Sequence, residues 1–339
     1  MKKISIKDIA IKAGVVPSTV SFVLNGRDKE MRISQTLTDK IKAIAEETGY
    51  YPNHTAVSLR TGKTKIIGLI VEDISNVFFS TLAKTIEDEA YAIGYKIVYC
   101  STENDDDKGN ELIKMLSRQQ VDGFLITPSS GMRSEIKKLL TQKKPLVLMD
   151  RYFPELDLHH TVVDNMNGVK MGMEHLCKKG YKNIGFVNVD LDQVQMQQRE
   201  LGYVTGLKEF APKAKPCILQ IFYKSKPAEF VEAIKIFILD NPQLDALFFA
   251  TNYLGTYGLQ ALRQLKVAIP AKIAVICFDD HEIFQFYTPS ITVISQPIEE
   301  IAKSAVRLLV NQLENMDHGN KESKKIQVTP PVLIEREST

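Results

Sequence analysis

The sequence predicts two folds in one chain: an all-α head in the first 50 residues and an α/β body from residue 66 onward. In the head, helix start and stop signals follow one another closely. In the body, short apolar runs alternate with amphipathic segments, as in parallel sheets covered by helices on both faces. A chain of 339 residues is also too long for one ordinary core.

Charge is distributed unevenly along the chain. Residues 1–65 carry twelve Lys and Arg against six Asp and Glu, a net charge of +6. The remaining residues carry 31 basic against 35 acidic groups, a net charge of −4. A basic head on a mildly acidic body predicts a polyanionic partner for the head alone.

The composition excludes several classes of protein. A hydrophobic fraction of 44% with 25% charged residues is typical of globular proteins. No apolar run approaches the roughly 20 residues of a membrane span, and the N-terminal segment lacks the apolar stretch of a secretory signal. The four cysteines show no C-x-x-C pair and no histidine at metal spacing. We therefore expect a cytoplasmic protein with free thiols, no metal, no cofactor and no membrane partner.

The first predicted helix begins with a capping-box pattern, in which Ser5 precedes Asp8 by three residues. Its apolar positions fall on one face: Ile6, Ile9, Ala10 and Ala13. Gly14 ends the helix, because glycine tolerates the left-handed backbone of a helix terminus.

A second helix is expected from Pro17, a residue suited to the first helical position, to the Asn25–Gly26 pair. A third is expected from about Ser34 to Thr48. Two short helices joined by a tight glycine turn, with a third behind them, predict a helix-turn-helix domain over residues 1–50.

The alternation of apolar runs and helical segments predicts that the body has two parallel-sheet lobes, about residues 66–162 and 163–290. Buried strands are expected at Ile66–Val71, Lys96–Tyr99, Gly123–Thr127, Leu146–Met149, Asn183–Asn188, Ile218–Phe222, Ala246–Ala250 and Ile273–Phe278. Open parallel sheets bind ligands beyond the carboxyl ends of their strands, here in a cleft between the lobes.

Polar residues at the strand ends are therefore the candidate ligand-binding residues. They are Asp73, Asn76, Asp150, Asn252 and Asp279. Carboxylates and amides hydrogen-bond sugar hydroxyls, and Phe78 or Phe79 is suited to stack on an apolar sugar face, the other belonging to the core. The alternative for a strand-end Asp or Asn is capping of the next helix. For His281 and the stretch Gln193–Gln198, the sequence allows two placements, in the cleft or on the surface.

The sequence motifs of the N-terminal region also resemble those of a known protein family. The matching segments are Ile6-Lys7-Asp8-Ile9-Ala10, Ala13-Gly14-Val15, Ser18-Thr19-Val20-Ser21, Leu24-Asn25, Gly49-Tyr50-Tyr51-Pro52-Asn53 and Ala56-x-x-Leu59. In this order they resemble the lactose/galactose repressor (LacI/GalR) family of bacterial transcriptional regulators, and the resemblance continues along the whole chain.

The resemblance implies that the second helix enters the major groove of double-stranded operator DNA. It makes Pro17, Ser18 and Phe22 candidates for base contacts, and Thr19, Ser21 and Asn25 candidates for phosphate contacts. Residues 51–65 would form a hinge helix and linker. There Asn53, His54, Ala56, Leu59 and Arg60 would contact DNA, with Leu59 wedged into a central base step from the minor groove.

For the body, the resemblance implies a periplasmic-binding-protein-like fold that dimerises, or forms a higher oligomer, and binds an effector. Arg199 lies in a segment similar to the one whose arginine holds the effector. Residues 291–297 and the next helix would return to the first lobe. Lobe 1 would then comprise about 66–162 and 291–322, and lobe 2 about 163–290 and 323–339. A sugar or sugar derivative is the favoured effector, with a purine or a sugar phosphate as alternatives.

Departures from the family pattern limit what can be transferred. Val16 replaces the usual capping serine, a loss of about 1 kcal/mol. Phe22 replaces an arginine that reads guanine; its ring either touches a thymine methyl or packs on the head itself. Tyr253 stands where Asp is common, and Cys277 where Gly is common, so the identity of the sugar is not transferred.

Taken together, these features predict a transcriptional repressor and not an enzyme. The sequence has no G-x-S-x-G elbow, P-loop, G-x-G-x-x-G fingerprint or H-E-x-x-H pair. An enzyme acting on a sugar or nucleotide is the alternative from another class, and turnover of the ligand distinguishes the two. A solute carrier of a transporter would need an export signal.

Overall fold

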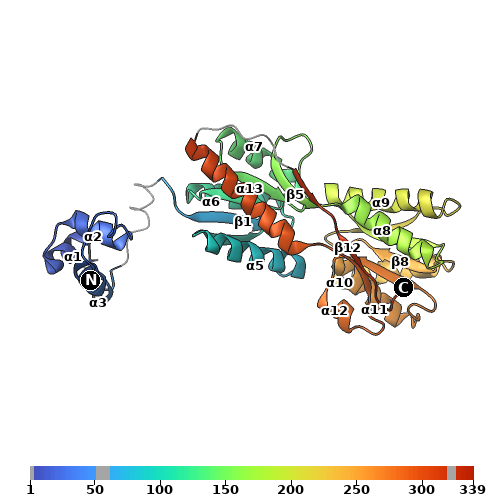
Figure 1. The fold of residues 1–339 in the computed structure, drawn as a ribbon. Coiled ribbons are helices and arrows are strands. Elements are labelled where there is room, and N and C mark those ends of the chain that lie inside the picture. The colour runs from blue at the N-terminus through green and yellow to red at the C-terminus, as the bar shows by residue number, and fades with distance from the viewer. Residues whose placement is uncertain (1–3, 51–61, 319–325) are drawn as a thin grey trace. The chain divides into compact units, whose positions relative to one another are not determined.

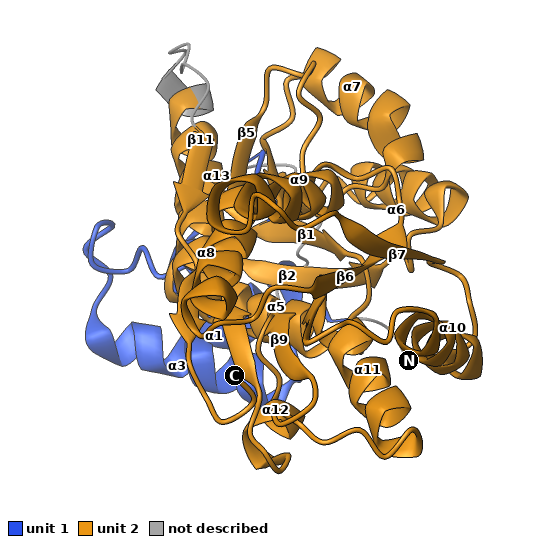
Figure 2. Ribbon diagram, turned by 90° about the vertical axis from the view of Figure 1, so that its right-hand side faces the viewer, with its two compact units in different colours: residues 1–64 blue, residues 65–339 orange. Residues whose placement is uncertain are grey.

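The computed structural model describes residues 4–50, 62–318 and 326–339. The chain divides into two units, residues 1–64 and 65–339, which Figure 2 colours separately. We call them the head and the body and describe each by itself. No helix among the described residues is both long enough and apolar enough to span a membrane.

The head contains three helices: α1 (Ile6–Ala13), α2 (Pro17–Leu24) and α3 (Gln35–Glu47). The predicted capping box of α1 is present, because the Ser5 hydroxyl accepts from the Asp8 N–H while the Asp8 carboxylate accepts from the Ser5 N–H. Gly14 ends α1 with a φ of 75°, as expected for a left-handed cap. The three helices share a small core: Ile9, Ala10, Ala13, Val20, Val23, Ile41 and Ala45.

The second helix begins as the sequence predicts. Pro17 occupies its first turn, and Val16 at the N-cap offers no side-chain hydrogen bond. A ten-residue connection then leads to Ser34, whose hydroxyl caps α3 by accepting from the N–H of Leu37 at 3.4 Å.

The first lobe of the body is a six-stranded sheet in the order β11-β5-β4-β3-β1-β2. Its strands are β1 (Ile66–Val71), β2 (Lys96–Ser101), β3 (Gly123–Ile126), β4 (Leu146–Met149), β5 (His159–Val163) and β11 (Ile326–Thr329). Its helices are α5 (Val77–Ala92), α6 (Asp106–Arg118), the 3-10 turn η1 (Ser130–Met132), α7 (Arg133–Thr141) and α13 (Ile298–His318).

Both faces of this sheet are buried at its central strands, which explains why β1 is apolar without alternation. Leu69 packs in the core shared with α5 and α13, whereas Ile70 packs in the core under α6 and α7. Successive strand residues point to opposite faces, so a strand covered on both sides needs apolar residues throughout. Figure 1 shows the helices on the two faces.

The second lobe is a six-stranded sheet in the order β12-β10-β9-β8-β6-β7. Its strands are β6 (Ile184–Asp190), β7 (Cys217–Phe222), β8 (Ala246–Phe249), β9 (Ala274–Phe278), β10 (Thr292–Ser295) and β12 (Val332–Ile334). Its helices are α8 (Asn165–Lys178), α9 (Val194–Phe210), α10 (Pro227–Asp240), α11 (Asn252–Gln264) and α12 (Glu282–Phe286).

The lobe boundaries differ from the prediction at two strands. Residues 291–295 do not return to the first lobe, because β10 pairs with β9 and β12 in the second sheet. Conversely, β11 lies within the segment predicted for the second lobe, but it pairs with β5 in the first sheet. The chain therefore passes between the lobes at 163–165, 295–298 and 329–332, which join the two sheets.

Candidate functional site

One side of α2 is open to solvent, and it carries polar residues. Ser18, Ser21, Phe22 and Asn25 line a hollow of about 120 Å³ together with Arg27. Pro17 is exposed and Thr19 is half-buried, and neither lines this hollow. The Asn25 amide donates to the Ser21 hydroxyl at 3.2 Å, which orients both side chains at the end of the helix.

Arg27 is a candidate DNA contact that the sequence analysis missed. Its guanidinium carbon lies 5.5 Å from the centre of the Phe22 ring, a cation–π distance. The same guanidinium pairs with Glu30 at 2.6 Å on the surface. The sequence could have identified Arg27, because it directly follows Asn25–Gly26 at the end of α2. A residue just after a helix end lies close to the last turn of that helix.

The hinge candidates Asn53, His54, Ala56, Leu59 and Arg60 lie outside the described residues. Their roles stay predictions from the family resemblance.

The cleft between the two lobes of the body holds two adjoining cavities. The inner cavity has a volume of about 40 Å³ and the outer cavity about 410 Å³. The inner cavity is lined by Glu72, Asn76, Phe78, Phe79, Asp150, Arg151, Val189, Leu191, Gln193, Gln195, Met196, Arg199, Thr251, Asn252, Tyr253, Asp279 and Gln296. It thus contains every predicted effector-binding residue except Asp73, which lines the outer cavity.

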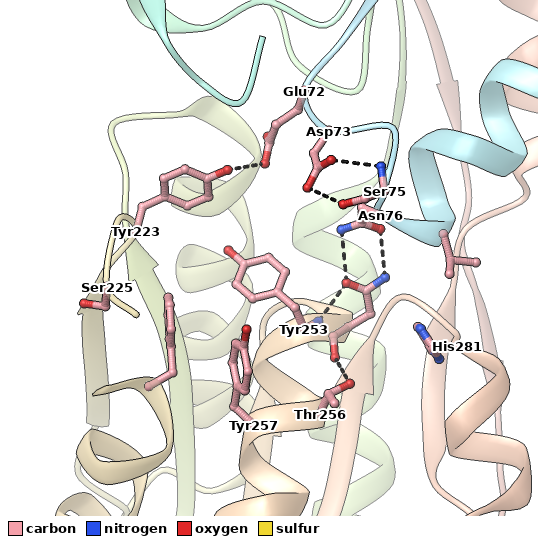
Figure 3. A pocket seen from close by; sticks show the side chains of 13 residues that line it. Glu72, Asp73, Ser75, Asn76, Tyr223, Ser225, Tyr253, Thr256, Tyr257 and His281 are labelled. Atoms are coloured by element: carbon pink, nitrogen blue, oxygen red, sulfur yellow. Dashed lines mark hydrogen bonds between the residues drawn. The ribbon is translucent and has the colours of Figure 1, made fainter. Parts of the chain in front are cut away.

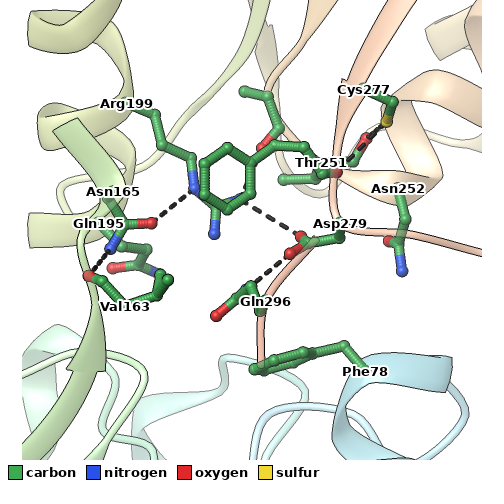
Figure 4. Close-up of polar contacts among 12 residues, drawn as sticks. Phe78, Val163, Asn165, Gln195, Arg199, Thr251, Asn252, Cys277, Asp279 and Gln296 are labelled. Carbon is green, nitrogen blue, oxygen red and sulfur yellow. Dashed lines mark hydrogen bonds and ion pairs between the residues drawn. The ribbon is translucent and has the colours of Figure 1, made fainter. Parts of the chain in front are cut away.

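Arg199 lies at the centre of the inner cavity's polar contacts (Figure 4). Its guanidinium donates to Asn165 Oδ1 at 2.8 Å and to the Ala250 carbonyl at 2.6 Å, and it pairs with Asp279 at 3.4 Å. The Phe278 ring stacks on it at 3.7 Å. These four contacts hold a charged side chain that is 2% exposed.

Helix packing sets the position of Arg199. The side chain projects from α9 toward Asn165 at the start of α8. The two helices approach so closely that a Cβ at Gly202 would lie 2.4 Å from the Met166 carbonyl oxygen. A glycine one turn after Arg199 therefore permits the contact with α8.

Two glutamines of the inner cavity hold unpaired acceptors. Gln296 donates its amide to Asp279 Oδ1 at 2.6 Å, and Gln195 donates to Gln193 at 2.9 Å. Both glutamines are buried, and neither side-chain oxygen has a hydrogen-bond partner among the described residues. A buried acceptor without a donor costs about 1–3 kcal/mol.

Asp150 belongs to a buried ionic cluster. Its carboxylate accepts from Arg151 Nε at 3.1 Å, while the far end of the same guanidinium pairs with Glu72. Burial raises the pKa of the Asp150 carboxyl, and the charge of Arg151 offsets only part of that effect. Asp150 does not begin a helix, so the capping alternative does not apply to it.

Asn76 and Asn252 join the two lobes directly. Their amides form reciprocal hydrogen bonds at 3.1 and 3.4 Å. Asn76 also caps α5 by accepting from the N–H of Phe78 at 3.0 Å, so the capping and cleft interpretations both hold for it. In the outer cavity, Asp73 accepts from the backbone and hydroxyl of Ser75, both at 2.8 Å (Figure 3).

The remaining candidates also have defined places. Phe78 and Phe79 meet edge to face at 4.9 Å; both are buried and both line the inner cavity. Gln193 and Gln195 line the inner cavity, and His281 lines the outer one. The sequence analysis missed Glu72, Arg151 and Gln296. Each lies next to a strand end, and this position could have identified it as a cleft residue from the sequence.

A basic helix-turn-helix head joined to a two-lobed body with a polar cleft defines a ligand-responsive, DNA-binding regulator. Residues 5–53 match the family model for bacterial regulatory proteins of the lacI family, and residues 173–339 match that for a periplasmic binding protein-like domain. The chain is 31% identical to the HTH-type transcriptional regulator RegA of Clostridium saccharobutylicum, over 99% of both chains.

It is also 30% identical to the ribose operon repressor of Escherichia coli, over 98% of this chain and 99% of that one. Among solved structures, a periplasmic binding protein/LacI transcriptional regulator from Alkaliphilus metalliredigens, complexed with D-xylulofuranose, is 26% identical with a TM-score of 0.70. The match covers 81% of this chain and 99% of that one. The chain therefore belongs to the LacI family of DNA-binding transcriptional regulators.

Proposed function

We propose that operator binding by this repressor is controlled by a neutral, hydroxyl-rich effector, a sugar, that binds in the inner cavity. The observation that carries the proposal is the pair of buried, unpaired oxygens on Gln195 and Gln296. Both need a donor, and a sugar hydroxyl supplies one while accepting from a neighbouring amide or guanidinium.

The charges of the inner cavity favour a neutral sugar over a sugar phosphate. Its lining includes three carboxylates, Glu72, Asp150 and Asp279, but only two guanidinium groups. Arg151 is paired with both Glu72 and Asp150, and Arg199 is paired with Asp279. A phosphate would have to compete for an arginine that is already paired, in a cavity whose lining has one more carboxylate than guanidinium groups.

Effector binding requires the lobes to move. A volume of about 40 Å³ is close to the roughly 30 Å³ share of one water molecule, too small for a sugar ring. The lobes are joined by hydrogen bonds from Tyr223 to Glu72 at 3.0 Å and from Gln193 to Asn104 at 3.1 Å. A ligand that replaces such bonds changes the orientation of one lobe relative to the other. This change of orientation couples effector binding to operator affinity.

In the head, we propose that α2 reads the operator. Pro17, Ser18 and Phe22 contact bases, while Thr19, Ser21 and Asn25 contact phosphates. Arg27 reaches a phosphate or a base beside Phe22. In the hinge, Leu59 wedges into the central base step, with Asn53, His54, Ala56 and Arg60 around it.

We propose that the body forms a homodimer. Large apolar side chains are exposed on both lobes: Ile93 and Tyr99 on the first, and Phe222 and Phe286 on the second. Tyr99 and Phe222 belong to β2 and β7, the edge strands of the two sheets. Edge strands also carry unpaired backbone N–H and C=O groups, which an interface between two copies of the chain would cover. A dimer would match a near-palindromic operator.

A thermal-shift screen tests the effector proposal. Neutral sugars, their phosphates and purine bases are each added to the full-length chain. A ligand at 100 times its Kd stabilises the protein by about 2.7 kcal/mol. We expect a neutral sugar to raise the unfolding temperature and to be recovered unchanged, since a regulator does not turn over its ligand. Stabilisation by a sugar phosphate or purine alone, or conversion of the sugar, would contradict the proposal.

A further inference from the structure

The outer cavity is much larger than the cavity that holds the polar anchors. Its volume of about 410 Å³ lies within the range of small-molecule sites, about 300–1,000 Å³. We infer that the effector is a disaccharide-type glycoside, with one sugar ring anchored in the inner cavity and a second sugar ring in the outer cavity. The inference rests on the proposed sugar-binding function and specifies the size of the ligand.

One wall of the outer cavity is an aromatic cluster, which we define as Phe230, Tyr253 and Tyr257. Phe230 stacks on Tyr257 with ring centres 5.1 Å apart and 15° between the planes. Tyr253 meets Phe230 edge to face at 6.1 Å. A pyranose ring has an apolar face of C–H groups, and an aromatic wall with fixed ring orientations provides the surface on which such a face packs.

The rest of the lining is polar apart from Val77, and it includes His281 and the acidic Glu72 and Asp73. Around the cluster lie Ser75, Tyr223, Ser225 and Thr256, and the described lining includes no lysine or arginine. Figure 3 shows the hydroxyl groups of Tyr223, Tyr253 and Tyr257 directed into the same space. Burial raises the pKa of Tyr223 and of Tyr253, so these phenols remain neutral hydrogen-bonding groups. Glu72 and Asp73 add acceptors and disfavour an anionic occupant.

The two cavities adjoin, so that one ligand can occupy both once the lobes move and enlarge the inner cavity. Glu72, Asn76, Asn252 and Tyr253 line the inner and the outer cavity. The boundary includes the Asn76–Asn252 amide pair, which joins the lobes at 3.1 and 3.4 Å. A glycosidic bond at this boundary would place one ring near Arg199 and the other against the aromatic cluster.

The test compares mono- and disaccharides on the full-length protein by isothermal titration calorimetry. D-xylose is compared with xylobiose, D-glucose with cellobiose and maltose, and D-galactose with lactose. We expect at least one disaccharide to bind at least tenfold more tightly than its component monosaccharide. A monosaccharide that binds as tightly as every disaccharide containing it would overturn the inference and leave the proposed function intact.

Two variants probe the outer cavity in opposite ways. Tyr257→Ala removes a stacking surface, and Ser225→Trp fills the space. Each should weaken the disaccharide at least fivefold and leave the monosaccharide unchanged. Tyr181→Ala, which removes a half-buried tyrosine outside both cavities, controls for lost packing. If neither folded variant changes disaccharide affinity, the second ring does not lie there and the inference is wrong. Binding of no sugar at all would contradict both the inference and the proposed function.

Discussion

Gln195 is 2% exposed, and its side-chain oxygen lacks a hydrogen-bond partner among the described residues. The unpaired acceptor destabilises the folded chain by about 1–3 kcal/mol, a cost that a ligand hydroxyl would remove. Gln195→Met removes the polar atoms and conserves most of the volume. We expect unchanged or higher thermal stability and effector affinity lowered by about five- to tenfold, the value of one or two hydrogen bonds.

Calorimetry with the identified sugar and thermal unfolding of the same samples provide both measurements. Gln119→Met, a change at an exposed position after α6, is the control. If Gln195→Met lost stability but not affinity, Gln195 would support the fold and not the ligand.

The carboxyl of Asp150 makes the stability of the native state depend on pH. Its pKa is raised by burial, so the native state holds this proton more tightly than the unfolded chain does. At a pH above the raised pKa, this difference in pKa lowers the free energy of unfolding. The loss disappears as the pH falls toward the pKa of Asp in the unfolded chain, near 4. Asp150→Asn removes the penalty at neutral pH and leaves Arg151 its bonds to Glu72 and Asn104.

We therefore expect Asp150→Asn to unfold at a higher temperature than the wild type at pH 7, with the difference shrinking at lower pH. Effector affinity should fall, because a carboxylate acceptor is lost. Asp240→Asn, at an exposed site, serves as the control in thermal unfolding at pH 7 and pH 5. A wild type that is the more stable protein at pH 7 would show that the pairing with Arg151 outweighs burial.

At the scale of the element, α2 and the turn after it form the predicted reading surface. The half-buried Phe22 ring has no donor for guanine but suits a thymine methyl. We expect half-sites with a thymine opposite Phe22 and a flexible pyrimidine–purine step, CG, at the operator centre, where a Leu59 wedge would meet weak stacking. Phe22→Arg should shift the preference at that position toward guanine, by about 1–3 kcal/mol.

A selection from randomised operators measures this shift. Ile11→Arg adds the same charge on an exposed position of α1 and should leave the preferred bases unchanged. Unaltered preferences in Phe22→Arg would mean that Phe22 packs on the head and, with Arg27, does not read bases.

Local signals predicted most elements of this fold, and the failures have a physical cause. The Ser5–Asp8 capping box, Gly14 and Pro17 act through neighbours in the sequence, so the helix ends that they mark were visible there. Strand β5 begins with two histidines and was not predicted. For β10 and β11, the sheet that each joins depends on contacts distant in sequence, which a short apolar run does not encode.

The same distinction applies to the site. Strand ends identified Asp150, Asn252 and Asp279 as cleft residues, because parallel sheets place these ends together. They did not reveal that Arg151 pairs with Glu72, 79 positions away, or that Gln296 bonds to Asp279. Each pair lies within one lobe and joins residues that follow different strands of the same sheet, so it forms only when that sheet is assembled.

In the whole molecule, we expect the body to dimerise and the head to read the operator sequence. We expect a chain that ends at Thr61 to bind operator about 10²–10⁴-fold more weakly than the full-length protein, because linked heads bind the second half-site at high effective concentration. Fluorescence anisotropy at matched salt measures both affinities. Equal affinities would show that the body adds nothing to operator binding.

The most direct test of the central claim is operator affinity measured with and without saturating effector, on the full-length protein at fixed salt. The account predicts a change of about 5- to 150-fold, the usual range of allosteric coupling. In Arg199→Ala, checked for folding by circular dichroism, operator binding should persist and the effector response should be lost. An effector that binds the cleft by calorimetry yet leaves operator affinity unchanged would contradict the account.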